Sequence, residues 1–365
     1  MKGIYIFATN DRDYKANGEA KKVLSQVKAF KKAGVEIEFL DIILDKKIDK
    51  LLYRLPFNGV YSNSFIEKCS TLSKNADFVF IRKNIFDNTY YKLLKAIKNA
   101  NPSIKIIVEI PTYPYFQEWN RLIDKPLIWK EKRVLPKVAE NHLVDYYLVL
   151  TDDEEVFGIK TIKFDNCIDV DDYIPKLNLQ KSDEVHLLGV ALLANWHGYD
   201  RVIKGISDYY KEALNNTKVF FHIVGDGPEY SNLRSLVKQY NLENYVLFEG
   251  KQHGENLNDL FNICTIGVGS LGIHRKGLTN ARSLKNREYC ARGIPFIKAG
   301  GDAPFDNYEY CLSFADNDDP IDISKIVRWA EKIDFKKATN DMHDYAICNF
   351  DWCKYIKEIL LKVEQ

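Results

Sequence analysis

The residues best suited to chemistry lie in the segment Ser283–Pro295, which has the sequence SLKNREYCARGIP. It begins with a typical N-cap residue, Ser283, and ends with the Gly and Pro that stop a helix, so it predicts a helix over Leu284–Arg292. Lys285 and Glu288 then lie about one turn apart, beside the positive N-terminal end of that helix. Such groups suit a ligand with phosphates and hydroxyls, for example a sugar nucleotide. A surface helix that carries an ion pair explains the same residues equally well.

Size and composition narrow the class of protein. The chain has 365 residues, enough for two α/β domains, and its formal net charge of +1 argues against a nucleic-acid partner. The seven Cys are scattered without a C-x-x-C pair, which argues for a reducing compartment and against both a disulfide framework and a zinc site. No signal peptide is apparent, and no apolar run approaches the about 20 residues that span a bilayer. We therefore expect a cytoplasmic protein, or one bound peripherally to the inner face of the cell membrane.

The N-terminal half alternates apolar strands with amphipathic helices. A strand over residues 4–8 precedes a helix that opens at Gly18, and a second strand follows over residues 35–40. This is a βαβ unit with glycine in its first turn, which is how doubly wound sheets begin. Further elements are expected as strands at residues 77–81, 104–110 and 146–150 and as a helix at residues 90–98. The pattern predicts a first Rossmann-like domain over residues 1–170.

The alternation stops in a polar, Pro-containing stretch near residues 164–183 and then resumes, which predicts a second Rossmann-like domain over residues 171–345. Its strands are expected at residues 185–193, 219–224, 246–248, 266–269 and from 296, and its helices at residues 201–212, 230–240, 256–261 and 284–292. Two such α/β domains in succession are expected to face each other across a cleft. The remaining residues 346–365 contain an amphipathic helix over Trp352–Val363, which either caps the second domain or crosses back to the first.

Four motifs in this order resemble the nucleotide-binding domain of the GT-B glycosyltransferases, in the mostly retaining family four (glycosyl transferases group 1). They are IVGDGPE at 223–229, VLFEG at 246–250, LFNICTIGVGSL at 260–271 and S-x-K-x-x-E-Y-x-A-x-G-x-P at 283–295. The N-terminal half matches more loosely, through Asn17-Gly18 and through DNCID at 165–169. The resemblance implies a metal-independent, retaining transferase that uses a nucleoside diphosphate sugar as donor and needs no cofactor.

Two positions depart from the family pattern. The segment NWHGYDR at 195–201 resembles the family's Lys-Gly turn, but His197 stands in the place of the Lys and Leu192 in the place of an Arg. Of the family's paired glutamates, Glu288 matches the second, whereas Asn280 occupies the position of the first. Arg275 and Lys276, in the basic segment that follows Gly269-Ser270, either supply replacement charges for the phosphates or belong to a solvated surface loop.

At the donor, the resemblance assigns Lys285 to the diphosphate, helped by Ser283 and by the N–H groups of the helix start. Glu288 is assigned to the ribose hydroxyls, because a carboxylate accepts two hydrogen bonds at once. Gly225 and Gly227 are expected to form a tight turn beneath the nucleotide, although a purely structural turn has the same signature.

Three further residues complete the set of candidates. His197 can donate a hydrogen bond to the sugar or to a phosphate, or it is a simple packing residue. Glu109, at a strand end, can bind an acceptor hydroxyl or accept its proton, or it is merely a solvated strand end. Gly18 would let a phosphate or the acceptor approach the backbone closely, or it simply starts a helix. No Asp-x-Asp offers a metal seat, so no metal ligand is expected.

The segment Lys125–Lys137, KPLIWKEKRVLPK, interleaves cations with apolar residues and Trp. It suits an anionic membrane surface that presents a lipid-linked acceptor, and a helix packed on its own domain explains it equally well.

Together these patterns predict a hexosyltransferase that moves a sugar to a glycan or lipid-linked saccharide acceptor in bacterial surface polysaccharide biosynthesis. A catalytically silent nucleotide-sugar or glycan-binding protein of the same fold is the alternative, because the usual cation clamp is missing. A nicotinamide-dependent oxidoreductase is disfavoured, since no G-x-G-x-x-G follows the first strand.

Overall fold

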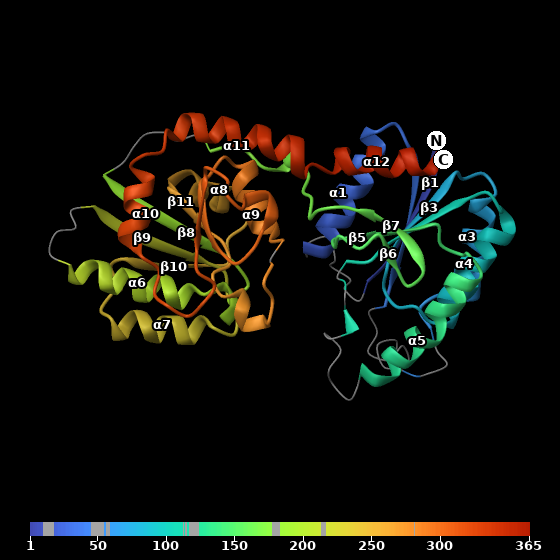
Figure 1. Cartoon of the computed structure of the whole chain (residues 1–365), viewed down its shortest axis with the longest axis horizontal. Coiled ribbons are helices and arrows are strands. Elements are labelled where there is room, and N and C mark those ends of the chain that lie inside the picture. The colour runs from blue at the N-terminus through green and yellow to red at the C-terminus, as the bar shows by residue number, and fades with distance from the viewer. Residues whose placement is uncertain are drawn as a thin grey trace. The chain divides into compact units, whose positions relative to one another are not determined.

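The structure is a computed structural model, and it describes residues 1–9, 18–44, 55, 59–111, 113, 115–116, 124–176, 183–212, 217–280 and 282–365. The chain forms two compact units (Figure 1). The first comprises Met1–Asp165 together with Trp352–Gln365, and the second comprises Asn166–Asp351.

The first unit contains a seven-stranded sheet of order β2-β1-β3-β4-β5-β7-β6, parallel except for the β6–β7 pair. Its strands are β1 (Lys2–Thr9), β2 (Glu36–Ile43), β3 (Phe78–Arg82), β4 (Lys105–Glu109), β5 (Tyr146–Val149), β6 (Glu155–Val156) and β7 (Ile159–Lys163). Its helices are α1 (Gly18–Lys32), α3 (Asn63–Ser73), α4 (Asn88–Ala100), α5 (Lys125–Glu140) and α12 (Trp352–Val363).

Strand β1 shows how this unit builds a core on both faces of its sheet. Ile4 and Ile6 join the apolar cluster formed with α3, α4 and α5. The alternate residue Tyr5 donates its hydroxyl to Gln26 of α1 on the opposite face. Burial on both faces explains why the strands are almost continuously apolar. Trp352, which begins α12, is fully buried, and α12 packs against α1, so the C-terminal helix returns to the first unit.

The second unit contains a six-stranded parallel sheet of order β10-β9-β8-β11-β12-β13, the doubly wound arrangement. Its strands are β8 (Glu184–Val190), β9 (Lys218–Val224), β10 (Val246–Gly250), β11 (Ile266–Val268), β12 (Phe296–Ala299) and β13 (Cys311–Phe314). Its helices are α6 (Tyr199–Lys211), α7 (Tyr230–Gln239), α8 (Gly254–Ile263), α9 (Leu284–Ala291), α10 (Ile323–Ala330) and α11 (Phe335–Phe350), with the 3-10 turns η5 (Asn195–His197) and η6 (Ile273–Lys276).

Helices cover both faces of this second sheet (Figure 1). Leu187 of β8 packs in the core shared with α6, α7 and α10, whereas its neighbour Leu188 packs in the core shared with α8, α9 and α11. The expected architecture of two Rossmann-like α/β domains is thereby confirmed. Among the described residues, none of the helices has both the length and the apolar character needed to cross a membrane.

Candidate functional site

Helix α9 holds the motif with which the sequence analysis began. It runs from Leu284 to Ala291, one residue shorter than predicted, with Arg292 as its C-cap. Ser283 is the N-cap residue, as predicted, although its side chain makes no capping hydrogen bond. The Ser283 carbonyl instead accepts hydrogen bonds from the backbone N–H of Asn286 at 3.1 Å and from Nη1 of Arg287 at 3.2 Å.

Buried polar contacts fix α9 on the sheet. The hydroxyl of Tyr289 donates to the carbonyls of Leu188 and Val268, at 2.9 and 3.1 Å, where β8 and β11 end. Arg287 and Asp302 form an ion pair of 2.6 Å in which both side chains are almost completely buried. Because breaking such a pair leaves a buried charge uncompensated, the start of α9 has little freedom to move.

Lys285 extends from α9 to the first residue of α6. Its Nζ donates to the hydroxyl oxygen of Tyr199 at 3.3 Å and lies 5.4 Å from the centroid of the Tyr199 ring. Burial lowers the pKa of Lys285 to about 7, against the smaller opposing effect of Glu288. Glu288 itself pairs with Nε of Arg292 at 3.2 Å. Within the described residues no carboxylate forms an ion pair with Lys285, which is the situation of a cation whose partner is a ligand.

His197 lies in the turn between β8 and α6, in the same neighbourhood. Its Nδ1 accepts the backbone N–H of Ala194 at 3.2 Å, so the neutral ring carries its proton on Nε2. Burial and then the charge of Lys285 lower the pKa of His197 to about 3, which keeps the ring neutral. Its ring centroid lies 5.7 Å from that of Tyr199. The structure therefore brings two predicted residues, Lys285 and His197, together around Tyr199.

The role of Tyr199 was not predicted from the sequence. Its position directly after Gly198, at the first residue of a helix, was the only available signal, and a buried aromatic is common there. The contact with Lys285 depends on an 86-residue separation in sequence that only the fold closes.

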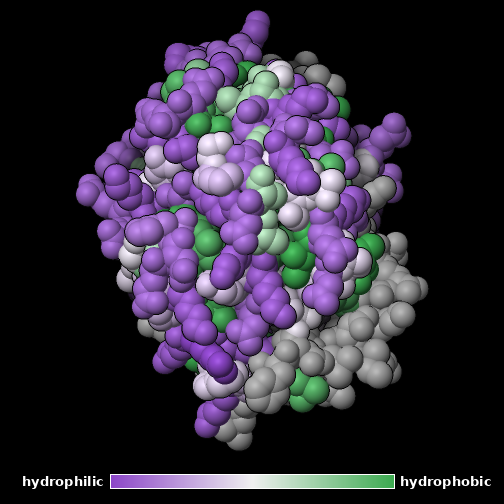
Figure 2. All heavy atoms as spheres, turned by 90° about the vertical axis from the view of Figure 1, so that its right-hand side faces the viewer, coloured by the Kyte–Doolittle hydropathy of each residue, from purple (hydrophilic) through white to green (hydrophobic). Residues whose placement is uncertain are grey.

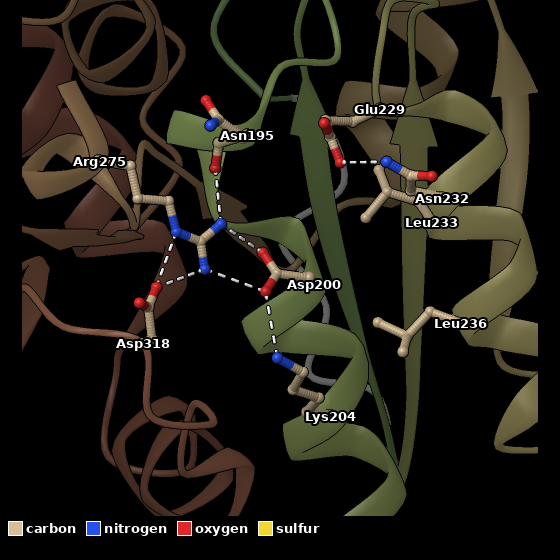
Figure 3. A pocket seen from close by; sticks show the side chains of 9 residues that line it. All are labelled: Asn195, Asp200, Lys204, Glu229, Asn232, Leu233, Leu236, Arg275 and Asp318. Atoms are coloured by element: carbon tan, nitrogen blue, oxygen red, sulfur yellow. Dashed lines mark hydrogen bonds and ion pairs between the residues drawn. The ribbon is translucent and has the colours of Figure 1, made fainter.

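Arg275 is held by two carboxylates instead of standing free for a phosphate (Figure 3). It pairs with Asp200 at 2.8 and 3.0 Å and with Asp318 at 2.7 and 2.8 Å, and it donates to the carbonyl of Asn195 at 2.7 Å. Its expected role at the diphosphate is therefore corrected: Arg275 ties η6 to the start of α6. The exposed Lys276 places its Nζ 4.5 Å from the ring centroid of Trp196, and its phosphate role stays a prediction.

A pocket of about 530 Å³ opens beside Arg275, between α6 and α7 (Figure 3). Its charged lining comprises three carboxylates and two cations, namely Asp200, Glu229, Asp318, Lys204 and Arg275. Because carboxylates are in excess, the pocket does not suit a diphosphate, and the Lys285 amine is not part of its lining. In the part of the chain that the structure describes, no three His, Cys, Asp or Glu side chains are grouped so as to hold a metal ion.

Gly225 and Gly227 form the tight turn after β9. Gly225 has φ +127°, and a Cβ there would lie 1.8 Å from the carbonyl oxygen of Ala191. A Cβ on Gly227 would lie 2.4 Å from the carbonyl oxygen of Leu193. Both glycines are required for the turns after β8 and β9 to pack together, and a direct role beneath the nucleotide stays a prediction.

Two asparagines position the residues that lead into α9. Asn166 Nδ2 donates to the carbonyl of Arg282 at 2.6 Å, which connects the DNCID motif to the residue before the N-cap. Asn280, at the position of the missing glutamate, forms a parallel bridge with Gly301. Both contacts join residues far apart in the chain or outside a regular spacing, and they were not predicted from the sequence.

In the first unit, Glu109 is completely buried at the end of β4. It pairs with Arg82 at 2.6 Å and Lys22 at 3.1 Å, and Gln26 donates to it at 2.9 Å. Burial alone would raise the pKa of Glu109, but Arg82 and Lys22, with Gln26, hold it at about 2. A general base needs an accessible carboxylate with a pKa near the working pH, so the expected acceptor role of Glu109 is wrong. It is the centre of a structural charge cluster.

Gly18 begins α1, as predicted. Residues 10–17, which lead to it, lie outside the described residues, so its expected approach to a phosphate or to the acceptor stays a prediction.

The basic segment Lys125–Lys137 falls in α5, and only one face of that helix is exposed. Lys130 is 3% exposed and cannot contact a surface partner, contrary to expectation. Trp129 is 45% exposed, and the guanidinium of Arg133 lies 5.3 Å from its ring. Exposed cations of this helix are Lys125, Lys132, Arg133 and Lys137.

Comparisons with known proteins include a family match that lies within the second unit. Residues 170–297 match the family described as Glycosyl transferases group 1. Protein CapJ of Staphylococcus aureus is 26% identical over 300 residues, which are 78% of this chain and 69% of CapJ.

Three solved structures share the fold over nearly their whole length. Sucrose-phosphate synthase from Thermosynechococcus elongatus superposes with a TM-score of 0.64 at 13% identity, covering 100% of this chain and 99% of that one. Anabaena Alr3699/HepE in complex with UDP-glucose gives 0.60 at 14% identity, with 99% and 100% covered. The lipopolysaccharide outer core galactosyltransferase WaaB gives 0.58 at 15% identity, with 99% of each chain covered.

Proposed function

We propose, from the premise that this chain is a nucleotide-sugar glycosyltransferase of group 1 with the GT-B fold, that it transfers a hexosyl group to a glycan or lipid-linked saccharide. The observation that carries the proposal is the Lys285 amine at the start of α9, in the neighbourhood of His197; no carboxylate among the described residues forms an ion pair with this amine. These two donors belong to the second unit, which contains the family match.

The chemistry explains why such donors are needed. In the transfer, the bond between the anomeric carbon and the phosphate oxygen breaks, the acceptor oxygen bonds to that carbon, and the proton of the acceptor hydroxyl passes to the departing diphosphate or to solvent. The departing diphosphate gains negative charge. Lys285, His197 and the N–H groups at the start of α9 are the groups we assign to this charge. A preorganised donor of this kind stabilises a transition state by about 3–4 kcal/mol.

Glu288 is assigned to the ribose of the donor. Its pairing with Arg292 uses one carboxylate oxygen, Oε1, and a carboxylate can accept further hydrogen bonds from hydroxyls. HepE was solved with UDP-glucose, and we therefore propose a UDP-sugar as the first donor to test.

Transfer is proposed to be metal-independent and cofactor-free, with retention of configuration. The positive charge of Lys285 and the N–H of the neutral His197 ring would stabilise the diphosphate as a divalent ion does in other sites. Undiminished transfer in EDTA supports this part of the proposal. The anomeric configuration of the product, read by NMR, decides between retention and inversion.

The acceptor is proposed to be a bacterial surface glycan precursor on the cytoplasmic face of the membrane. The exposed cations and Trp129 of α5 suit an anionic bilayer surface. Figure 2 shows one face of the molecule, on which hydrophilic side chains predominate and apolar ones form small separate patches, so attraction would be largely electrostatic. Flotation with anionic liposomes tests this: Lys132→Glu with Arg133→Glu should abolish binding, while Lys2→Glu, on the strand β1, should not.

The central test is release of nucleoside diphosphate from a panel of sugar nucleotides, with and without saccharide acceptors. Wild type should release it, and Lys285→Ala should bind and turn over donor less well. A folded wild type that binds a sugar nucleotide but never breaks it down would indicate a silent binding protein instead. A folded wild type that binds none refutes the proposal.

A further inference from the structure

The core holds the side chain of Tyr199 in place, and the hydroxyl is the polar group of that side chain. Its side chain is 2% exposed, and its ring packs edge-on against Phe221 at a centroid distance of 5.3 Å. Gly189 lies over the same ring, so that a Cβ there would be 2.6 Å from a ring carbon. Burial raises the pKa of the phenol, which therefore stays protonated. The hydroxyl oxygen therefore accepts a hydrogen bond from the Lys285 amine. Because the core fixes the Tyr199 ring, it also fixes the position of this hydrogen bond.

Among the residues that the structure describes, no carboxylate forms an ion pair with the Lys285 amine. From η5, His197 faces it as a neutral ring. From η6, Lys276 adds a further positive charge near His197 and lies over Trp196. On its own helix, Glu288 opposes the lowering of the Lys285 pKa, and its Oε1 is paired with Nε of Arg292. A buried ammonium in such surroundings favours either loss of its proton or arrival of an anion.

We propose that Tyr199 is a positioning residue that holds the Lys285 amine beside His197, and that this amine takes up a proton when the donor diphosphate arrives. The proton comes from solvent and converts the neutral amine to an ammonium ion, which then faces the phosphate oxygens. This inference rests on the proposed function, since it describes how the same site receives its donor.

The size of the effect follows from the pKa of about 7 for Lys285 in the free protein. Binding of a diphosphate restores the charged form, so uptake should be about 0.1 proton at pH 6, about 0.5 at pH 7 and about 0.9 at pH 8. Because the neutral form must first be protonated, donor affinity should fall about fivefold between pH 7 and pH 8. The diphosphate of a sugar nucleotide is a diester without a group that titrates near neutrality, so the proton is taken up by the protein.

Calorimetric titration of UDP-glucose in buffers of different ionisation enthalpy measures this uptake directly. Lys285→Arg, whose guanidinium keeps its charge, should still bind but show no proton uptake and a flat pH profile. Tyr199→Phe should weaken binding and shift the pH profile. Tyr209→Phe, also buried in α6 but bonded to the carbonyl of Thr217, is the matched control and should leave both unchanged.

The experiments distinguish failure of this inference from failure of the proposed function. Donor binding without proton uptake by wild type overturns the inference and leaves the proposed function intact. Absence of any sugar-nucleotide binding refutes the proposed function, and the inference falls with it. NMR of lysine Cε in the ligand-free protein gives an independent readout: one signal should titrate near pH 7 and be missing in Lys285→Arg. Titration of every lysine above pH 9 overturns the inference.

Discussion

Replacing Lys285 by methionine should make the protein more stable and at the same time impair donor binding. Methionine fills a similar volume without a charge. The wild-type Lys285 is partly buried, and within the described part of the chain no carboxylate forms an ion pair with its amine, so its charged form is disfavoured in the folded state. If Lys285 lowers the stability of the folded protein and is needed to bind the donor, its function opposes stability.

The magnitude follows from the shift of the pKa from 10.5 to about 7. Each unit corresponds to about 1.4 kcal/mol, so the unfavourable burial amounts to about 4 kcal/mol at pH 7 as an upper bound. We expect a gain of about 1–4 kcal/mol in the free energy of unfolding for Lys285→Met. The direction in which the free energy of unfolding changes with pH also follows from the lowered pKa. Between pH 7 and 10 the unfolded state binds more protons than the folded state, so wild type gains stability as the pH rises and the advantage of the variant shrinks.

Urea unfolding of both proteins at pH 7, 8 and 9 measures these differences, since a shift of the midpoint with unchanged slope reports stability. Lys285→Gln is a useful second variant, because it also removes the charge but keeps a polar end. A Lys285→Met protein that is no more stable than wild type at pH 7 would refute the reasoning, as would a constant difference across this pH range.

Three further predictions follow from other contacts. Glu109→Gln should lower the free energy of unfolding by about 3–5 kcal/mol at pH 7, since it removes the buried negative charge that Arg82 and Lys22 both contact. Urea unfolding of the variant and wild type tests this, and wild type should lose the difference as the pH falls from about 4.5 toward 2. Glu288→Ala should lower sugar-nucleotide affinity about tenfold or more by calorimetry, through loss of charge-assisted hydrogen bonds to hydroxyls, and unchanged affinity would contradict its assignment. Gly225→Ala should destabilise the second unit measurably by thermal unfolding, whereas Gly250→Ala, also at positive φ but without a neighbour within 4 Å, should cost less.

The sequence was sufficient for most of the fold because the strands are buried on both faces. Continuous apolar runs such as β1 and β9 are visible without knowledge of their partners. The short antiparallel β6 and the α10–α11 segment were not predicted. Two residues of strand give almost no periodic signal, and α10 is a helix of only eight residues.

The candidate site was only partly predictable, for a different reason. Chemical type and helical spacing indicated Lys285 and Glu288. They did not indicate which charged side chains would form ion pairs with oppositely charged residues in the folded protein. Glu109 and Arg275 have the same residue types as functional groups, yet the fold surrounds each with opposite charges from distant segments. Conversely, Lys285 donates to the phenol of Tyr199, and no carboxylate that the structure describes forms an ion pair with it. Compensation depends on long-range contacts, which spacing along the chain does not reveal.

The return of α12 to the first unit has a consequence for biosynthesis. Residues 166–351 form one continuous stretch and can acquire their native structure as soon as they leave the ribosome, whereas residues 1–165 must wait for Trp352 to be translated before α1 gains its neighbour. Until then, the surface of α1 that α12 will cover stays open to water and to chaperones. Nascent chains arrested just before codon 352 should therefore expose their N-terminal half to protease more readily than chains released after residue 363.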